Sequence, residues 1–279
     1  MDVVSDLFDG QAASFDQRAG LPAEYCHDIA DAVVEIGQAG AGDLLVEVGS
    51  GTGQIGRWFG PGIRYLGLDK SARMLDEFQR RLSGANRDNG GNNDFGDRAL
   101  IRADADAGWP VAEGAARVIF SSRAMHLLNR RHAVSEVFRV ASREGATLIL
   151  GRVEREPNSV KKQLAKEMND RIRRQGFEAH RSDKGSQRLV ESCCRRGAEA
   201  MQPVRVATWR VIATAGQLVD SWRKVVGLGG VPIPAHTKEE ILKELELWAK
   251  GVFGRLDRQF ESTEAYVLTP VRMPGRSNS

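Results

Sequence analysis

The chain is poor in cysteine, in aromatic residues and in net charge. Its 279 residues include three cysteines and 6% aromatic side chains, and the formal net charge is only +3. Cys26, Cys193 and Cys194 lack metal-site spacing and are too few for a disulfide framework. We therefore expect no metal and a reducing, cytoplasmic compartment. A charge balance this even also disfavours nucleic acid as a partner.

Long hydrophobic runs are missing as well. No apolar stretch approaches the roughly 20 residues that a membrane-spanning helix needs, so no membrane association is expected. Residues 1–10 are acidic and lack the layout of a signal peptide. The composition, 41% hydrophobic and 28% charged, is that of a globular protein with a sizeable core. It predicts one large α/β domain, with room for an embedded cap.

The most informative stretch is residues 44–53, with the sequence LLVEVGSGTG. The apolar start predicts a buried parallel strand. The three glycines at alternate positions predict a sharp turn, because glycine tolerates positive φ and lets a ligand lie against the backbone. A helix is expected to follow and to direct its free N–H groups at that ligand. The stretch therefore predicts a site for a nucleotide-like cofactor.

Two classes of cofactor are compatible with this turn. Residues 51–56, GTGQIG, match the G-x-G-x-x-G fingerprint of dinucleotide-binding proteins. The wider pattern adds acidic residues: Glu47 precedes the glycines, and two further predicted strands, residues 64–68 and 99–103, lead into Asp69 and Asp104. Ligands of open parallel sheets bind at the carboxyl ends of the strands, where these carboxylates would gather. Negative charge there suits a cation better than a pyrophosphate.

The ordered set of motifs, which continues through a fourth strand at residues 118–122, resembles the class I S-adenosylmethionine-dependent methyltransferases over about residues 43–150. The resemblance implies an α/β fold: a doubly wound, seven-stranded, mostly parallel Rossmann-like sheet with an antiparallel last strand and helical cap insertions. It implies S-adenosyl-L-methionine as cofactor and S-adenosyl-L-homocysteine as product. The cofactor-binding residues that it implies are Glu47, Gly49, Ser50, Gly51, Gly53, Asp69, Lys70, Asp104, Ala105 and Ser121.

Individual roles follow from the same resemblance. Glu47 would order the glycine loop, Asp69 would accept the ribose hydroxyls, and Asp104 with the Ala105 N–H would bind the adenine. A simpler alternative is that Asp69 and Asp104 only cap helices, which accounts for either alone but not for both. One departure is Arg117, which stands where the family commonly has an aspartate at the start of the fourth strand.

The chain outside this core divides into three predicted parts. Residues 1–42 are expected to form a helical lid segment, in which Phe15 and Arg18 are candidate substrate contacts. Residues 43–156 form the cofactor-binding core. Residues 157–279 complete the sheet and add cap insertions at about 157–185 and 213–258. In the second insertion, Trp222 is a candidate substrate contact, although packing within the cap explains such a residue equally well.

Methyl transfer from a sulfonium needs alignment of acceptor, methyl and sulfur, and a base only where the acceptor must lose a proton. His126, just after the fourth strand, is the candidate catalytic and substrate-contacting residue; ordering the cofactor loop is its alternative role. We expect a small-molecule acceptor (O, N or C), and the arginines of residues 171–174 and 195–196 admit an anionic one. An RNA or tRNA methyltransferase and a non-catalytic cofactor-binding relative remain alternatives, as do monomer and homodimer.

Overall fold

The computed structural model describes residues 20–88, 97–178 and 182–275. Their contacts divide the chain into two compact units. The sheet unit contains the described residues up to 152 together with 182–207 and 266–275. The helical unit contains 153–178 and 208–265. No helix of the described residues is long and apolar enough to cross a membrane.

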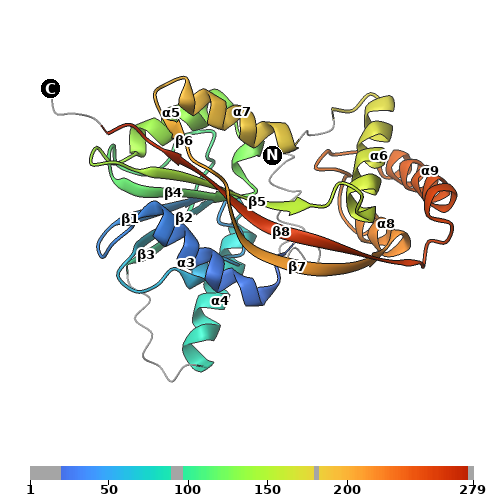
Figure 1. Cartoon of the computed structure of the whole chain (residues 1–279), viewed down its shortest axis with the longest axis horizontal. Helices are drawn as coiled ribbons and strands as arrows, with labels where there is room; N and C mark the ends of the chain where they lie inside the picture. Colours follow the sequence, from blue (N-terminus) through green and yellow to red (C-terminus); the bar gives the residue numbers. More distant parts are fainter. Residues whose placement is uncertain (1–19, 89–96, 179–181, 276–279) are drawn as a thin grey trace. The chain divides into compact units, whose positions relative to one another are not determined.

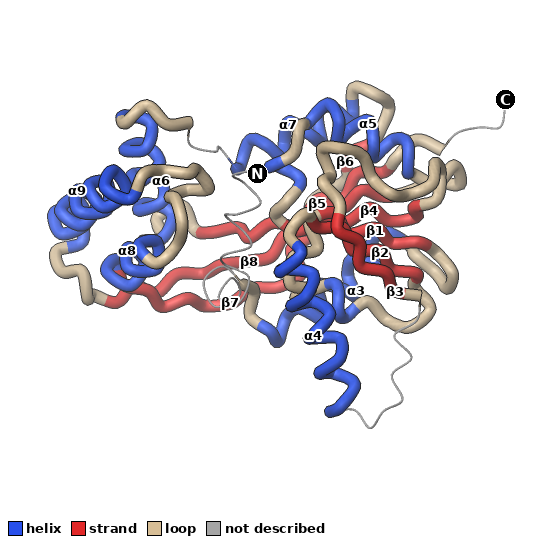
Figure 2. Tube along the Cα trace, turned by 180° about the vertical axis from the view of Figure 1, so that it is seen from behind, coloured by secondary structure: helices blue, strands red, loops and turns tan. Residues whose placement is uncertain are grey.

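The sheet begins with a parallel block of five strands (Figure 2). In spatial order they are β3 (Arg98–Arg102), β2 (Arg64–Asp69), β1 (Leu44–Val48), β4 (Ala116–Ser122) and β5 (Thr147–Arg155). β8 (Gln259–Arg272) lies next to β5 and runs antiparallel to β6 (Glu199–Ala200), while β7 (Val204–Thr214) also pairs with β8. The predicted Rossmann-like sheet with its antiparallel end is confirmed. Within the described residues the sheet has eight strands rather than the predicted seven, because the two-residue β6 pairs separately with β8.

Helices cover both faces of the sheet unit (Figure 1). α3 (Cys26–Gly37) and α4 (Ala72–Asp88) lie on one face, and α5 (Arg130–Val140) and α7 (Ser182–Cys194) lie on the other. An aromatic cluster fills the first face, and an aliphatic core fills the second. The aromatic cluster consists of Phe59, Tyr65, Phe78 and Phe120.

The segment after the glycine loop departs from the sequence prediction. Instead of a helix it contains a single 3-10 turn, η2 (Gly56–Trp58), and the chain is already extended at Phe59, ahead of the Gly60–Pro61–Gly62 break. Glycine and proline so soon after the loop leave no room for a helix. A helix N-terminus, which would hold a dinucleotide pyrophosphate, is therefore absent from this part of the described chain.

Two helices end at identifiable points. α4 runs to Asp88, the last described residue before 97. α7 stops at Cys194, three residues before Gly197, whose φ of +93° ends helical geometry. The short 3-10 turns η1 (Ala23–Tyr25) and η3 (Met125–Leu127) precede α3 and α5.

The helical unit consists of α6 (Val160–Arg174), α8 (Ala215–Arg223) and α9 (Ala235–Phe253) around a core of its own. Leu164, Ile172, Leu242 and Leu245 are fully buried there. Side-chain caps begin two of the helices: Ser159 accepts from the Lys162 N–H, and Thr214 forms a capping box with Gln217. The unit therefore has the packing of an independent helical core.

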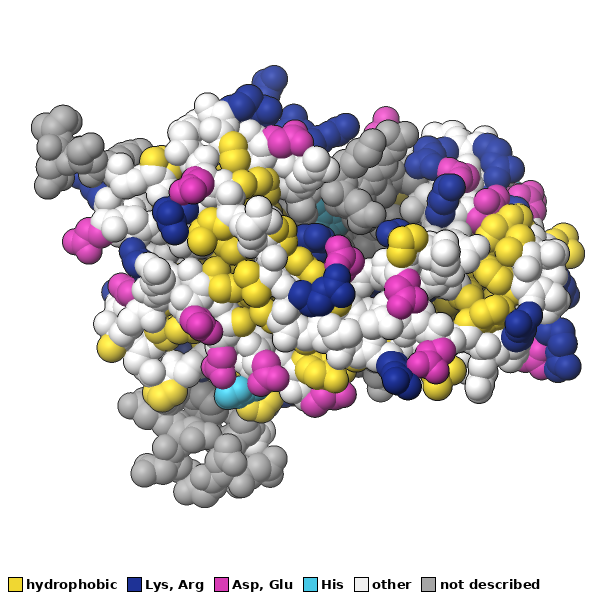
Figure 3. All heavy atoms as spheres, in the orientation of Figure 1, with side chains coloured by type: hydrophobic (Ala, Val, Ile, Leu, Met, Phe, Trp, Pro, Cys, Tyr) yellow, Lys and Arg dark blue, Asp and Glu magenta, His cyan; other side chains and the backbone are white. Residues whose placement is uncertain are grey.

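Charges on the helical unit are largely paired within it. Arg171 pairs with Glu167 and with Glu244, and Arg173 pairs with Asp170. Lys and Arg side chains alternate with Asp and Glu on the face shown in Figure 3. The arginine run of residues 171–174 is thus engaged by neighbouring carboxylates, which favours a structural role over the binding of an anion.

Candidate functional site

The glycine loop between β1 and β2 is built from three left-handed residues. Gly49, Gly51 and Gly53 have φ values of +74°, +55° and +72°. Side chains at Gly49 and Gly53 would overlap Ala124 and the ring of Phe78. At Gly51 an added Cβ would meet no atom of the described residues within 4 Å. The backbone at Gly51 therefore faces space free of described atoms, whereas Gly49 and Gly53 must lack a side chain because their neighbours pack against them.

Asp69, the last residue of β2, fastens this loop. Its Oδ2 accepts from the Gly51 N–H at 2.8 Å, and its Oδ1 accepts from the Ser71 N–H at 2.9 Å. A carboxylate has about four acceptor positions, so bonds to the loop and to ligand hydroxyls are compatible. The structure thus brings together Gly51 and Asp69, two of the predicted cofactor residues.

Glu47 lies beneath the loop. Its side chain is buried, and its Oε2 accepts from the Tyr65 hydroxyl at 2.6 Å. A Cβ at Gly56 would lie 2.6 Å from the same oxygen, so the carboxyl supports the loop from below. Burial raises the pKa of Glu47 to about 8, with a smaller contribution from Asp69 and opposition from the Tyr65 hydrogen bond. Glu47 is therefore largely protonated at pH 7, so it adds little to the negative charge that disfavours a pyrophosphate.

Asp104 follows β3, next to the end of β2. The Ala103 N–H donates to the Asp69 carbonyl at 3.0 Å, which places the two strand ends side by side. The Asp104 side chain is exposed, and its Oδ1 accepts from the Asp106 N–H at 2.9 Å. The Ala105 carbonyl accepts from Trp109 Nε1 at 3.0 Å, which anchors the loop after β3. These strand ends agree with the expected edge of acidic residues.

Three further predicted cofactor residues differ in how their polar groups are engaged. Ser121 Oγ donates to the Val48 carbonyl at 2.8 Å and accepts from the Met125 N–H at 3.1 Å. Ser50 Oγ is buried and has no hydrogen-bond partner among the described residues. The Lys70 carbonyl accepts from Arg102 Nε at 3.2 Å. A contribution of Ser121 to cofactor binding would be indirect, through the positions of β1 and η3.

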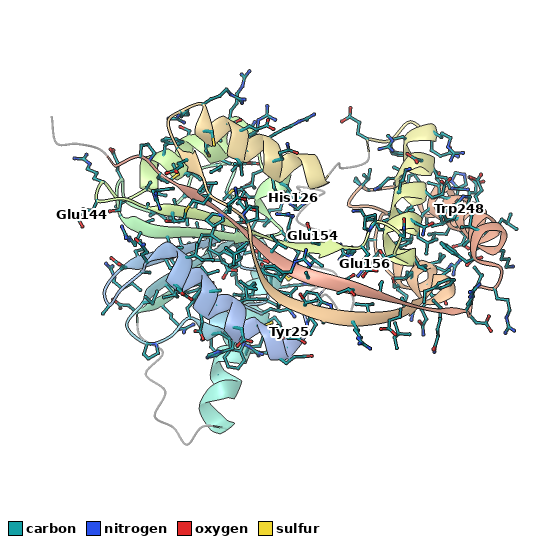
Figure 4. All side chains as sticks on the ribbon, viewed as in Figure 1. Tyr25, His126, Glu144, Glu154, Glu156 and Trp248 are labelled. Atoms are coloured by element: carbon teal, nitrogen blue, oxygen red, sulfur yellow. The ribbon has the colours of Figure 1, made fainter. Side chains whose placement is uncertain are left out.

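His126 lies in η3, between the end of β4 and α7 (Figure 4). It is half-buried, and α7 packs on it so closely that a Cβ at Gly185 would lie 2.9 Å from His126 Cβ. Trp222 is a member of the helical unit and packs against the core of that unit. Phe15 and Arg18 lie outside the described residues.

The departure at Arg117 lies at the opposite end of the sheet. Arg117 is the second residue of β4, and its guanidinium donates to the carbonyls of Gln38 (3.3 Å) and Gly145 (2.8 Å). Glu144, beside Gly145, marks that end in Figure 4, far from His126. Arg117 therefore fastens loops at the amino ends of the strands and leaves the carboxyl ends unaffected.

Sequence reasoning missed several residues that support the loop. Arg98 Nη1 donates to the Gly56 carbonyl at 2.9 Å, and Nη2 donates to the Phe59 carbonyl. The Gln54 side chain accepts from the Leu21 N–H at 3.1 Å and donates to the Leu21 carbonyl at 3.4 Å. These partners are 33 to 42 residues apart in the chain. No local pattern signals such contacts.

Comparison with known proteins defines the class. Residues 46–149 match the methyltransferase domain family. This segment holds most of β1, the glycine loop, Asp69, Asp104 and His126, so the chain contains a methyltransferase domain and the predicted class of enzyme is confirmed. No curated protein sequence matches the chain.

Solved structures share the fold at low sequence identity. A proposed methyltransferase from Bacillus halodurans is 16% identical, with a TM-score of 0.55 over 88% of this chain and 98% of its own. The YcgJ protein from Bacillus subtilis is also 16% identical, with a TM-score of 0.53 over the same shares. The [4+2]-cyclase SpnF, again 16% identical, has a TM-score of 0.50 over 89% of this chain and 80% of its own. At this identity the likeness establishes the fold alone.

Proposed function

We propose that the protein transfers a methyl group from S-adenosyl-L-methionine to a small-molecule metabolite, at an oxygen, nitrogen or carbon atom. The observation that carries the proposal is the open space at Gly51, bordered by the Asp69 carboxylate within a matched methyltransferase domain. A left-handed glycine whose added Cβ would meet no described atom is what a ligand lying against the backbone requires. No group of three or more metal-ligating side chains occurs in the described parts of the chain.

The residues divide by the part of the cofactor they would hold. The loop from Gly49 to Gly53 would lie against the methionine part, Asp69 would accept the ribose hydroxyls, and Asp104 with the Ala105 N–H would bind the adenine. When bound, the sulfonium supplies an electrophilic methyl carbon. The chain would then align the acceptor with that carbon and exclude water.

His126 would serve acceptors that must lose a proton. Its position after β4 belongs to the same edge of the sheet as the glycine loop, because Ala124 contacts Gly49. A histidine titrates near neutral pH and can take a proton from a hydroxyl or an amine. If His126 instead orders the glycine loop, replacing it would lower turnover only by weakening cofactor binding.

The acceptor side includes more of the chain than the matched segment. We retain the predicted lid segment of residues 1–42, with Phe15 and Arg18 as candidate contacts, although its helix α3 packs on the sheet. We also retain the insertions at about 157–185 and 213–258 as a cap for a cytoplasmic metabolite. Trp222 packs within the helical unit, so it would act on an acceptor only from a face that this packing leaves accessible. An RNA substrate is disfavoured because Arg171 and Arg173 are already paired with carboxylates.

A second candidate is a relative that binds the cofactor without transferring its methyl group. SpnF, which shares the fold, is a [4+2]-cyclase. The fold alone therefore does not fix the reaction. This candidate predicts cofactor binding with an intact loop and no turnover of the cofactor.

The experiment is a calorimetric titration with S-adenosylmethionine, S-adenosylhomocysteine and NAD run side by side. Binding of the first two and no binding of NAD would support the proposal and justify a screen of acceptors. Binding of NAD alone would refute it. Formation of S-adenosylhomocysteine in the screen then separates the transferase from the cofactor-binding relative.

A further inference from the structure

The turn that follows β4 has an unusual backbone conformation. Arg123 has a φ of +60°, and among the described residues only Gln38 shares a positive φ without being glycine. The left-handed region is unfavourable for a residue with a Cβ, and such a conformation persists only where the surroundings impose it. The chain then passes through Ala124 into η3, which carries His126.

Hydrogen bonds hold this turn to β5, to the end of β4 and within η3. The Arg123 N–H donates to the Gly151 carbonyl at 3.1 Å and so continues the β4–β5 ladder by one residue. Ser121 Oγ accepts from the Met125 N–H at 3.1 Å, and the Leu127 N–H donates to the Ala124 carbonyl at 2.9 Å. These bonds fix both ends of the turn.

The other face of the turn is held by a residue from the far end of the chain. Tyr266 on β8 is fully buried, and its hydroxyl donates to Ser122 Oγ at 2.6 Å. Gly151 makes room for the ring, because an added Cβ would overlap the hydroxyl and lie 2.7 Å from Cζ. Alternating residues of a strand point to opposite faces, so Ser121 and Ser122 fasten the end of β4 from both sides.

The phenol remains a donor under ordinary conditions. Burial raises the pKa of Tyr266, the Ser122 bond and the charge of Arg123 oppose this, and Glu47 and Cys26 add to it. The Tyr266 hydroxyl therefore keeps its proton and uses it in the hydrogen bond to Ser122 Oγ. Tyr266 can therefore affect the site only through the turn.

We propose that Tyr266 is a positioning residue for the acceptor side of the site: through Ser122 it holds the Arg123 turn and thereby sets the place of His126. The role of His126 as a base for the acceptor rests on the proposed function. The dependence of the turn on Tyr266 does not, and it is measured in the ligand-free protein.

The test compares Tyr266→Phe with Thr269→Val. The control removes a hydroxyl from the same strand, one that accepts from Arg152 Nη1 at 2.8 Å rather than touching Ser122. Hydrogen exchange followed by mass spectrometry should show the amides of Arg123, Met125 and Leu127 exchanging about threefold to tenfold faster in Tyr266→Phe, as expected for one lost hydrogen bond. Thr269→Val should leave these amides at the wild-type rate.

A second readout separates positioning from general loosening. The midpoint of the His126 imidazole titration, followed by NMR, should shift in Tyr266→Phe and in Ser122→Ala but not in Thr269→Val. Unchanged exchange and an unchanged midpoint in Tyr266→Phe would overturn the inference, as would equal changes in the control. Failure of wild-type protein to bind S-adenosylhomocysteine would instead count against the proposed function, whatever the exchange results.

Discussion

Alanine at Gly51 should mainly impair cofactor binding, whereas alanine at Gly53 should mainly lower the stability of the fold, although the two glycines are only two residues apart. Both have positive φ, so each substitution carries about 1–2 kcal/mol of backbone strain. At Gly53 the methyl also overlaps the Phe78 ring, and overpacking adds about 1–3 kcal/mol. At Gly51 the methyl enters open space and adds nothing to the strain. We expect losses of about 1–2 kcal/mol for Gly51→Ala and about 2–5 kcal/mol for Gly53→Ala.

Cofactor affinity should be affected directly at Gly51, where the loss of stability is the smaller one. The Gly51 methyl would occupy the space through which the proposed cofactor passes, so Gly51→Ala should lose most of its affinity for S-adenosylhomocysteine while the protein remains folded. Urea unfolding gives the stability, and calorimetry of the folded variant gives the affinity. Wild-type affinity in Gly51→Ala would refute the assignment of this space to the cofactor. A stability loss at Gly51 as large as that at Gly53 would refute the steric reasoning.

Three other predictions concern single side chains. Asp69→Ala should weaken S-adenosylhomocysteine binding by about 1.5–3 kcal/mol, measured by calorimetry, because it removes a charged acceptor; unchanged affinity would contradict the ribose assignment. In the wild type, the folded protein holds the Glu47 proton more tightly than the unfolded chain, so its free energy of unfolding falls as pH rises from about 4.5 to about 8. Glu47→Gln lacks this titration, so its stability should increase relative to that of the wild type over the same pH range. Urea unfolding at both ends of the window measures this gain, and a pH-independent difference would count against it. His126→Ala should keep cofactor affinity and lower kcat in a methyl-transfer assay for a hydroxyl or amine acceptor; equal turnover would remove the base role.

Local pattern predicted the parallel block of the sheet because each of its strands is a short apolar run with a turn signal after it. β1 is the apolar run that opens residues 44–53. The strands β5 and β8 have outer parts in which charged residues such as Arg155 and Glu264 occur, so these parts lack the apolar signal that predicted the first four strands. Those two side chains form an ion pair at 2.7 Å, which no local pattern reveals.

The candidate site shows the same limit. The glycines and Asp69 were predicted from the order of strand and turn signals along the chain, and the structure joins Gly51 to Asp69 by a 2.8 Å hydrogen bond. The sequence also indicates that Glu47 is acidic, but not that it is buried against Tyr65 and protonated, because that depends on a contact 18 residues away. No sequence pattern singled out Tyr266. Its partner Ser122 is 144 residues distant, so its link to the turn needed the fold.

The place of β8 has a consequence for how the protein is made. β8 lies between β5 and β6 in the sheet, yet it is synthesised roughly 120 residues after β5, which takes about 6–24 s at 5–20 residues per second. Until then the edge of β5 lacks its native neighbour, and an unpaired edge strand invites association with other chains. The edge of β5 in the nascent chain can therefore be covered only after β8 has been synthesised. Chaperone dependence during translation should fall sharply once β8 has left the ribosome.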